Sequence, residues 1–319
     1  MRSLRSALVP TLAVAVGLAL AACEPATTPP TVPTTVSTTV TPTPLTIGGD
    51  EFHGTGLDAS RWRAYSGTYG NAGGGSRHCL APSNVTVADD VLRITSERTP
   101  TPCADGSVQP YRSGFIGSRE AGRYYPLEGT FTVRAKVPHA QGIWPAVWLR
   151  HRNGAGVAEV DLLESFHAQA PGRVSQVLHL DGKVNVANRA TFFESPTPTP
   201  GWHTFAVRID RLDGDGDGRE DDVRFDFSVD GRATHGHLDV DPRWLAAADP
   251  AATWDVAINT AVDGRWVGDP DGALGRLDQI GRCSISGQYP DCSATGIRRV
   301  DWSRPVTFEI DWVRVDALA

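Results

Sequence analysis

The sequence predicts an all-β protein whose single large domain is an antiparallel β-sandwich. Glycine and proline are frequent, at 33 and 23 of 319 residues, and clear helical periodicity is scarce. Short runs of alternating β-branched or aromatic residues recur instead, with turn residues between them. These runs are residues 84–87, 91–96, 129–137, 144–149, 157–163, 204–209, 223–229, 255–262 and 306–315. So many short strands in one domain are typical of a sandwich.

The first 22 residues have the composition of a signal peptide. Arg2 and Arg5 precede an apolar run over 7–22, which is a little short for the roughly 20 residues of a membrane helix. The string LAAC at 20–23 resembles a bacterial lipobox, which implies cleavage before Cys23 and a lipid on its sulfur. Ordinary secretion, with Cys23 lost or idle, is the alternative. In both cases we expect an exported protein, with membrane contact only through the N-terminal lipid.

Residues 23–45 form a Thr/Pro-rich linker, and residues 46–319 form the predicted domain. The linker has no charge after Glu24 and no aromatic residue, so it cannot bury apolar surface and should be extended. The remainder carries all 9 Trp and contains no second linker of this kind, which favours one domain. The net charge of −7 and the lack of a basic block argue against nucleic acid as a partner. A monomer is the default expectation.

The cysteines form two local pairs once Cys23 is set aside. Cys79 is near Cys103 in the sequence, and Cys283 is near Cys292. An exported chain allows disulfides, and loops of these lengths close easily. Four cysteines permit three connectivities, among which proximity favours Cys79–Cys103 and Cys283–Cys292.

The strongest chemical signal is the string AEVDLLESF at 158–166, which places three acids in an otherwise apolar strand. Side chains alternate along a strand, so Glu159 and Asp161 share a face and Glu164 should point the other way. One extra residue at Leu162 or Leu163, a bulge, would return Glu164 to that face. An exposed acidic strand without chemistry is the alternative.

The preceding strand, IWPAVWL at 143–149, adds two tryptophans to this surface. A hairpin turning about Asn153 and Gly154 pairs residues whose numbers sum to 307. That register sets Trp148 opposite Glu159 and, beyond the bulge, Trp144 beside Glu164. Aromatic faces stack on sugar rings, and retaining glycoside hydrolysis requires two carboxyls about 5–5.5 Å apart. We therefore expect a glycosidase site, with Asp161 hydrogen-bonded to Glu159 and Glu164 as the protonated acid.

These motifs resemble glycoside hydrolase family 16, especially its laminarinase-like branch with a bulged Glu-x-Asp-x-x-Glu motif. The resemblance covers most of the domain, through residues 50–62, 84–96, 113–149, 201–210, 225–231 and 306–315. It implies a jelly-roll (concanavalin A-like) sandwich with a substrate cleft on its concave face. It also implies retention of anomeric configuration, with Glu159 as nucleophile, Asp161 as assisting acid and Glu164 as acid/base.

The same resemblance implies further roles. Arg119, Trp144, Trp148 and His179 match positions that contact substrate or line the cleft in the family. We also expect His167, Asn259 and Trp266 to reach the cleft from late or neighbouring strands, with a packing or loop role as the alternative. His203 also falls at a histidine position of the family, although a hydrogen-bonded sheet histidine is the favoured interpretation. No cofactor is required, but Asp311 matches a position that ligates a structural calcium in several relatives. An acid there can equally pair with an arginine. Asp263 and Gly264 stand where the family often has Gly-Gly, beside the expected cleft.

Endo-hydrolysis of an extracellular β-linked polysaccharide is the favoured function, with a β-1,3- or β-1,3-1,4-glucan as substrate. A β-galactan such as agarose or carrageenan, or transglycosylation by the same mechanism, is the second enzymatic hypothesis. A non-catalytic, lectin-like carbohydrate-binding module is the hypothesis from another class. It would keep the tryptophans but would not need all three acids.

Overall fold

The computed structural model describes residues 45–68, 75–153, 156–165, 173–182, 189–196, 201–214, 216, 222–242, 253–264, 267–272 and 300–318. By contacts, the chain separates into Met1–Thr41 and Pro42–Ala319, and the described residues all lie in the second unit. The signal peptide, Cys23 and nearly all of the linker lie outside the described residues. Among the residues described, no helix has the length and apolar character needed to cross a membrane.

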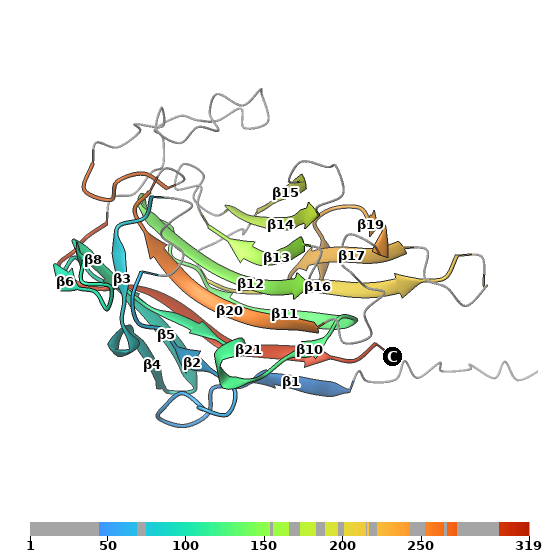
Figure 1. Cartoon of the computed structure of the whole chain (residues 1–319), viewed down its shortest axis with the longest axis horizontal. Coiled ribbons are helices and arrows are strands. Elements are labelled where there is room, and N and C mark those ends of the chain that lie inside the picture. The colour runs from blue at the N-terminus through green and yellow to red at the C-terminus, as the bar shows by residue number, and fades with distance from the viewer. Residues whose placement is uncertain are drawn as a thin grey trace, which may run out of the picture. The chain divides into compact units, whose positions relative to one another are not determined.

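The fold is an antiparallel sandwich of two large sheets, as the strand pattern predicts (Figure 1). The nine-stranded sheet has the order β18 (Arg232–Ala233), β17 (Asp222–Val229), β16 (Trp202–Leu212), β11 (Gly129–Lys136), β21 (Val306–Asp316), β5 (Val91–Ser96) and β4 (Val85–Ala88), with β1 (Thr46–Asp50) on β21 and β19 (Leu238–Val240) on β17. The eight-stranded sheet has the order β15 (Arg189–Pro196), β14 (Arg173–Gly182), β13 (Gly156–Glu164), β12 (Ile143–Asn153), β20 (Thr253–Val262), β9 (Phe115–Gly117) and β2 (Arg63–Ala64), with β10 (Tyr125–Pro126) on β20.

Smaller elements complete the described part of the unit. They are the parallel pair β3 (His78–Leu80) and β8 (Tyr111–Ser113), the antiparallel pair β6 (Thr101–Pro102) and β7 (Val108–Gln109), and the 3-10 turns η1 (Pro82–Asn84) and η2 (Arg119–Ala121). A disulfide between Cys79 and Cys103, whose Cα atoms are 5.5 Å apart, joins β3 to the segment after β6. Cys283 and Cys292 lie outside the described residues.

The hydrophobic core fills the space between the two sheets. Side chains that alternate along β12 and β13, such as Val147 and Val160, are buried there together with Phe131 and Phe225 of the other sheet. Because successive side chains point to opposite faces, the intervening residues of β12 and β13 lie on the face turned away from the core. That face carries the acids and tryptophans of the predicted site.

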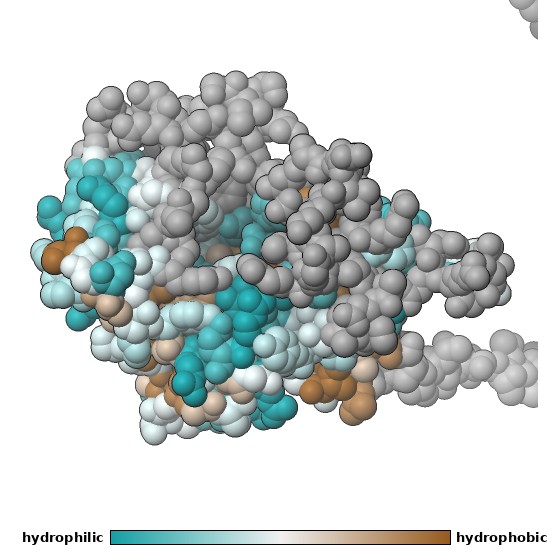
Figure 2. Space-filling model, viewed as in Figure 1, coloured by the Kyte–Doolittle hydropathy of each residue, from teal (hydrophilic) through white to brown (hydrophobic). Residues whose placement is uncertain are grey.

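The surface of this unit offers little apolar area. The large hydrophobic side chains exposed in the described ranges are Leu45, Ile47, Val108 and Tyr124. On the face shown in Figure 2, hydrophilic residues predominate and apolar ones form small separate patches.

Candidate active site

A β-bulge in β13 brings the three acids to one face, as the sequence predicts. Trp148 pairs with Asp161 and Val147 pairs with Leu163, so Leu162 is the extra residue. The pairing with β14 is likewise interrupted between Asp161 and Glu164. Leu162 and Leu163 are both buried in the core, and the strand therefore returns Glu164 to the side of the other acids.

The register of the β12–β13 hairpin differs from the predicted one by two residues. Asn153 pairs with Gly156, so the turn lies at residues 154–155 and paired residues before the bulge sum to 309. Arg150, rather than Trp148, is therefore opposite Glu159. A shift of two residues leaves every side chain on its original face, so the acids and tryptophans still share the face that was predicted for them.

Both tryptophans of β12 lie at the acids. The indole Nε1 of Trp144 donates a hydrogen bond to Glu164 Oε1 at 2.9 Å, which places this residue beside Glu164 as expected. Trp148 donates to Asn259 Oδ1 at 2.7 Å, and Trp148 pairs across the strands with Asp161. Asn259, predicted to bind substrate, therefore fixes the orientation of the Trp148 ring.

The acids differ in exposure, and a histidine lies among them. Asp161 is 2% and Glu164 8% exposed, whereas the Glu159 side chain is 34% exposed. His179 in β14 is the cross-strand partner of Glu159. Its Nε2 lies 3.2 Å from Asp161 Oδ2 and 3.8 Å from Glu159 Oε1. His179 thus contacts the carboxyl groups themselves.

Burial and mutual repulsion separate the proton affinities of the acids. Burial raises the pKa of Glu164 well above its ordinary value, and the charge of Asp161 raises it further. The pKa of Asp161 is also well above its ordinary value, through burial and the charge of Glu159. Burial raises the pKa of Glu159, but the charges of His179 and Arg150 oppose that rise. Glu164 is therefore the group best suited to hold a proton near neutral pH, and Glu159 the one best suited to be ionised.

One expected contact within the cluster is different. Asp161 was expected to hydrogen-bond Glu159, but among the described residues its buried Oδ2 has no hydrogen-bond partner, and Glu159 acts on it through charge. Asp161 Oδ2 lies 3.2 Å from His179 Nε2. The histidine of β14 is therefore the neighbour that sequence reasoning did not place beside Asp161.

Arg119 lies in η2 and donates from Nη2 to Asp255 Oδ1 at 2.5 Å. His167 and Trp266 lie outside the described residues. His203 is in the nine-stranded sheet, where its Nδ1 is 2.8 Å from Asp230 Oδ2, in line with its interpretation as a hydrogen-bonded sheet histidine.

Asp311 forms an ion pair with Arg134 of the neighbouring strand β11, which was the alternative to calcium. Calcium at this position stays a prediction. Within the described ranges, one group of acid and histidine side chains is close enough to share an ion, and its ligand atoms lie within 4.8 Å of one another: Glu159, Asp161 and His179. We interpret that group as the reacting carboxyls with their histidine neighbour and assign it no metal.

Asp263 has a backbone φ of 67°, a conformation that glycine adopts without strain, which explains why glycine suits this position. Its side chain is buried and forms an ion pair with Arg77, whose Nη2 is also 3.4 Å from Asp269 Oδ2. The aspartate at this position thus ties Arg77, just before β3, to the segment after β20.

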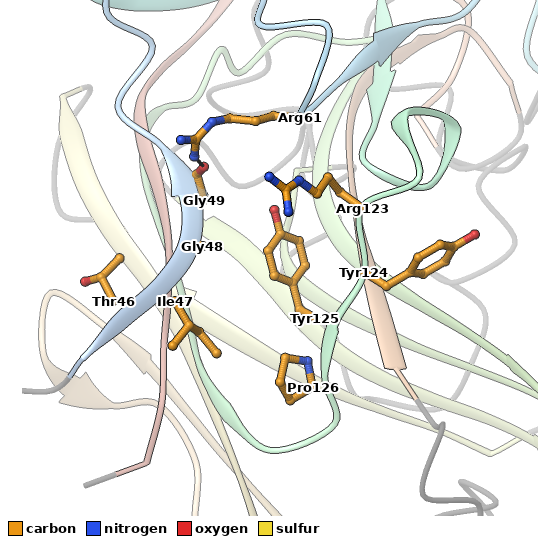
Figure 3. Close-up of a pocket in the computed structure, with 9 residues that line it drawn as sticks. All are labelled: Thr46, Ile47, Gly48, Gly49, Arg61, Arg123, Tyr124, Tyr125 and Pro126. Atoms are coloured by element: carbon orange, nitrogen blue, oxygen red, sulfur yellow. Dashed lines mark hydrogen bonds between the residues drawn. The ribbon is translucent and has the colours of Figure 1, made fainter.

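A cavity of about 580 Å³ lies elsewhere, between β1 and β10 (Figure 3). In this cavity the Tyr125 hydroxyl points toward the guanidinium of Arg123, and Arg61 donates a hydrogen bond to the backbone carbonyl of Gly49. No residue of the carboxyl cluster lines it, so this cavity is separate from the candidate active site.

A sandwich that gathers three carboxyl groups and two tryptophans on one face of a sheet brings together the groups that glycoside hydrolysis uses. Residues 77–210 match the model of "Glycosyl hydrolases family 16", and this match confirms the resemblance to that family.

Three similar proteins agree with this assignment. "Glucan endo-1,3-beta-glucosidase A1" of Niallia circulans is 26% identical over 308 residues, which cover 86% of this chain and 39% of that protein. "Endo-1,3-1,4-beta-glycanase EglC" of Rhizobium meliloti (strain 1021) is 30% identical over 126 residues, which cover 38% of this chain and 26% of that protein. The chain thus spans well under half the length of each of these relatives. The structure of endo-beta-1,3-glucanase from Pyrococcus furiosus has a TM-score of 0.62 at 18% identity, covering 86% of this chain and 94% of that one, which confirms the fold.

The bulge makes a prediction of its own. Deleting Leu162 leaves Glu-Val-Asp-Leu-Glu, a regular alternation that keeps all three acids on one face. We expect the variant to fold and to retain measurable hydrolysis, with a free energy of unfolding lower by about 2–5 kcal/mol because a buried leucine is lost. Denaturant unfolding and reducing-sugar release measure the two effects.

Leu163→Ala is the matched control, because it removes similar burial without changing the register. Inserting one alanine after Leu162 also gives a regular alternation, but it moves Glu164 two strand positions, about 7 Å, farther from Asp161 and should abolish hydrolysis. A folded deletion variant with no activity would contradict the prediction, since it would mean that facing the right side of the sheet is not sufficient.

Proposed function

We propose that this protein is a retaining endo-β-glycanase that hydrolyses a β-1,3-glucan or a mixed β-1,3-1,4-glucan. The observation that carries the proposal is the bulge at Leu162, which places Glu159, Asp161 and Glu164 together beside two tryptophans. In this mechanism the ionised Glu159 attacks the anomeric carbon while Glu164 protonates the departing glycosidic oxygen. Glu164 then removes a proton from the water that cleaves the glycosyl-enzyme. Each of the two steps inverts the configuration of the anomeric carbon, so the configuration is retained overall.

Two further features support the proposal. The two curated relatives carry names of glucan-cleaving enzymes, one for β-1,3 and one for β-1,3-1,4 linkages. The half-buried indoles beside the acids offer flat apolar surfaces of the kind on which sugar rings stack. A polymeric substrate outside the cell also accords with export and an N-terminal lipid anchor, which we include in the proposal on the strength of the lipobox-like LAAC string.

The test is reducing-sugar release from laminarin, lichenan, agarose and xyloglucan, with product size followed by chromatography. We expect oligosaccharides from laminarin and lichenan early in the reaction, and NMR should show that the β-anomer forms first. Cleavage of agarose alone would mean that the substrate is a galactan and not a glucan. Binding without cleavage of any polymer would favour the lectin-like alternative. Labelling with palmitate in a bacterial host, compared between the wild type and Cys23→Ser, tests the lipid anchor.

A further inference from the structure

Arg150 is a fully charged side chain in an unusual place. It is only 5% exposed, and it lies in the middle strand of three that build the site. On one side β13 sets it directly opposite Glu159, and on the other β20 sets it opposite Asp255. No substrate-binding role was predicted for it, because the predicted hairpin register placed Trp148 opposite Glu159.

The guanidinium of Arg150 is held from several sides. Its Nε donates to Asp255 Oδ2 at 2.7 Å, and its Nη2 lies 3.4 Å from Glu120 Oε2. Its Cζ lies 5.2 Å from the centre of the Trp148 ring, within the range of a cation–π contact. A planar guanidinium bound in this way has little freedom to turn. Arg150 therefore connects the Trp148 ring to Asp255 and Glu120.

The surrounding backbone leaves room for this arrangement. A Cβ atom on Gly117 would lie 3.0 Å from Arg150 Nη2 and would collide with Glu120 Oε2. Asp255, which is 1% exposed, also accepts the hydrogen bond from Arg119. The cluster thus contains two cations and two anions, so the charge of Arg150 is balanced by residues behind it rather than by Glu159.

We propose that Arg150 is a positioning residue that keeps Glu159 ionised and holds the Trp148 ring in place. The assignment of Glu159 as nucleophile rests on the proposed function. The role of Arg150 follows from its position: a buried cation directly across the strand pair from a carboxyl group favours the charged form of that group. The direction agrees with the lowering effect of Arg150 on the pKa of Glu159.

The effect of Arg150 has to be separated from that of the other charges facing Glu159. The other charged or titratable groups in the described ranges are His179 from β14, Asp161 and Glu164 from the strand of Glu159, and, behind Arg150, Asp255 of β20 with Glu120 and Arg119 of η2.

Two substitutions in the cluster should move the pKa of Glu159 in opposite directions. Arg150→Met removes a cation and should raise that pKa by about one pH unit. Asp255→Asn removes the anion that balances Arg150 and should lower it.

The experiment titrates the carboxyl carbon of Glu159 by ¹³C NMR in the full-length protein without substrate, with Glu159→Gln used to assign the signal. We expect an upward shift in Arg150→Met, a pKa close to wild type in Arg150→Lys, and a downward shift in Asp255→Asn. The acidic limb of the kcat/KM profile should move in the same directions on whichever polymer the wild type cleaves. If the wild type cleaves none, the proposed function fails, while the titration still decides the role of Arg150.

Arg134→Met is the matched control. Arg134 also pairs with an aspartate and also lies 5.2 Å from a tryptophan ring, that of Trp202, but in the other sheet. The Arg134→Met substitution should leave the pKa of Glu159 unchanged. If Arg150→Met does not fold, Arg150→Lys and Asp255→Asn still carry the test. An unchanged Glu159 pKa in folded Arg150→Met, or shifts of the same sign in Arg150→Met and Asp255→Asn, would overturn the proposal.

Discussion

Replacing Glu159 by alanine is expected to lower kcat/KM on a β-glucan by roughly 10⁴-fold or more, because the covalent route is then lost. The fold should be retained. The Glu159 side chain is 34% exposed and lies outside the hydrophobic core, so its removal opens no core cavity. Initial rates on laminarin, with thermal unfolding followed by circular dichroism, measure activity and stability separately.

The role of Glu159 can be distinguished from mere binding by chemical rescue. In Glu159→Ala, azide should enter the space left by the carboxylate and attack an activated aryl β-glycoside, giving the α-glycosyl azide. Glu309→Ala is the control, since Glu309 is a half-buried glutamate on the nine-stranded sheet that pairs with Lys136. Activity of Glu159→Ala within tenfold of the wild type, or rescue that gives the β-azide, would assign the nucleophile to another residue.

Replacing Glu164 by glutamine is expected to lower kcat/KM on unactivated glucans by about 10²–10⁴-fold, the usual contribution of a general acid. Glutamine can still accept the hydrogen bond from Trp144, so the local geometry should persist, but it cannot give a proton to the departing oxygen. The loss should shrink on substrates with acidic leaving groups, such as a dinitrophenyl glycoside. An equal loss on both kinds of substrate would show that Glu164 is not the acid.

The pH dependence follows from the same carboxyl group. Burial and the charge of Asp161 raise the pKa of Glu164, so its protonated form persists to higher pH than that of an ordinary glutamate. The wild-type kcat/KM should therefore fall on the alkaline side as pH rises through that pKa. In Glu164→Gln this alkaline limb should be absent, because the residue that ionises has been removed. A limb that survives unchanged would belong to another group, such as Asp161, whose pKa burial also raises.

Much of the site could be predicted because the information is local. The alternation of Glu159, Val160 and Asp161 fixes which residues face the core, and two successive leucines before Glu164 cannot both face the core without an extra residue in the strand. The strand runs of the sandwich are equally local, since each consists of alternating apolar residues with turn residues between them. These features depend on spacing along the chain, and the structure reproduces them.

Pairing between strands was harder to predict. Asn153 and Gly154 suit a turn, yet the strand continues through Asn153, because Asn153 still pairs with Gly156 of β13. The approach of His179 to Asp161 was not predicted for a related reason, since it depends on how β14 pairs with β13. Neither feature can be recognised from the spacing of residues along one strand.

The sequence by itself determined the sandwich, the three acids that share a face, and the two tryptophans beside them. Side-chain direction in a strand depends on spacing along the chain and on the bulge that two successive buried leucines require. Only the tertiary structure decided which residue lies across from each acid and how their charges are balanced. Arg150 shows the physical reason: its influence on Glu159 comes from register and from Asp255, more than 100 residues away. Electrostatic effects depend on distance in space, which the order of residues along the chain does not specify.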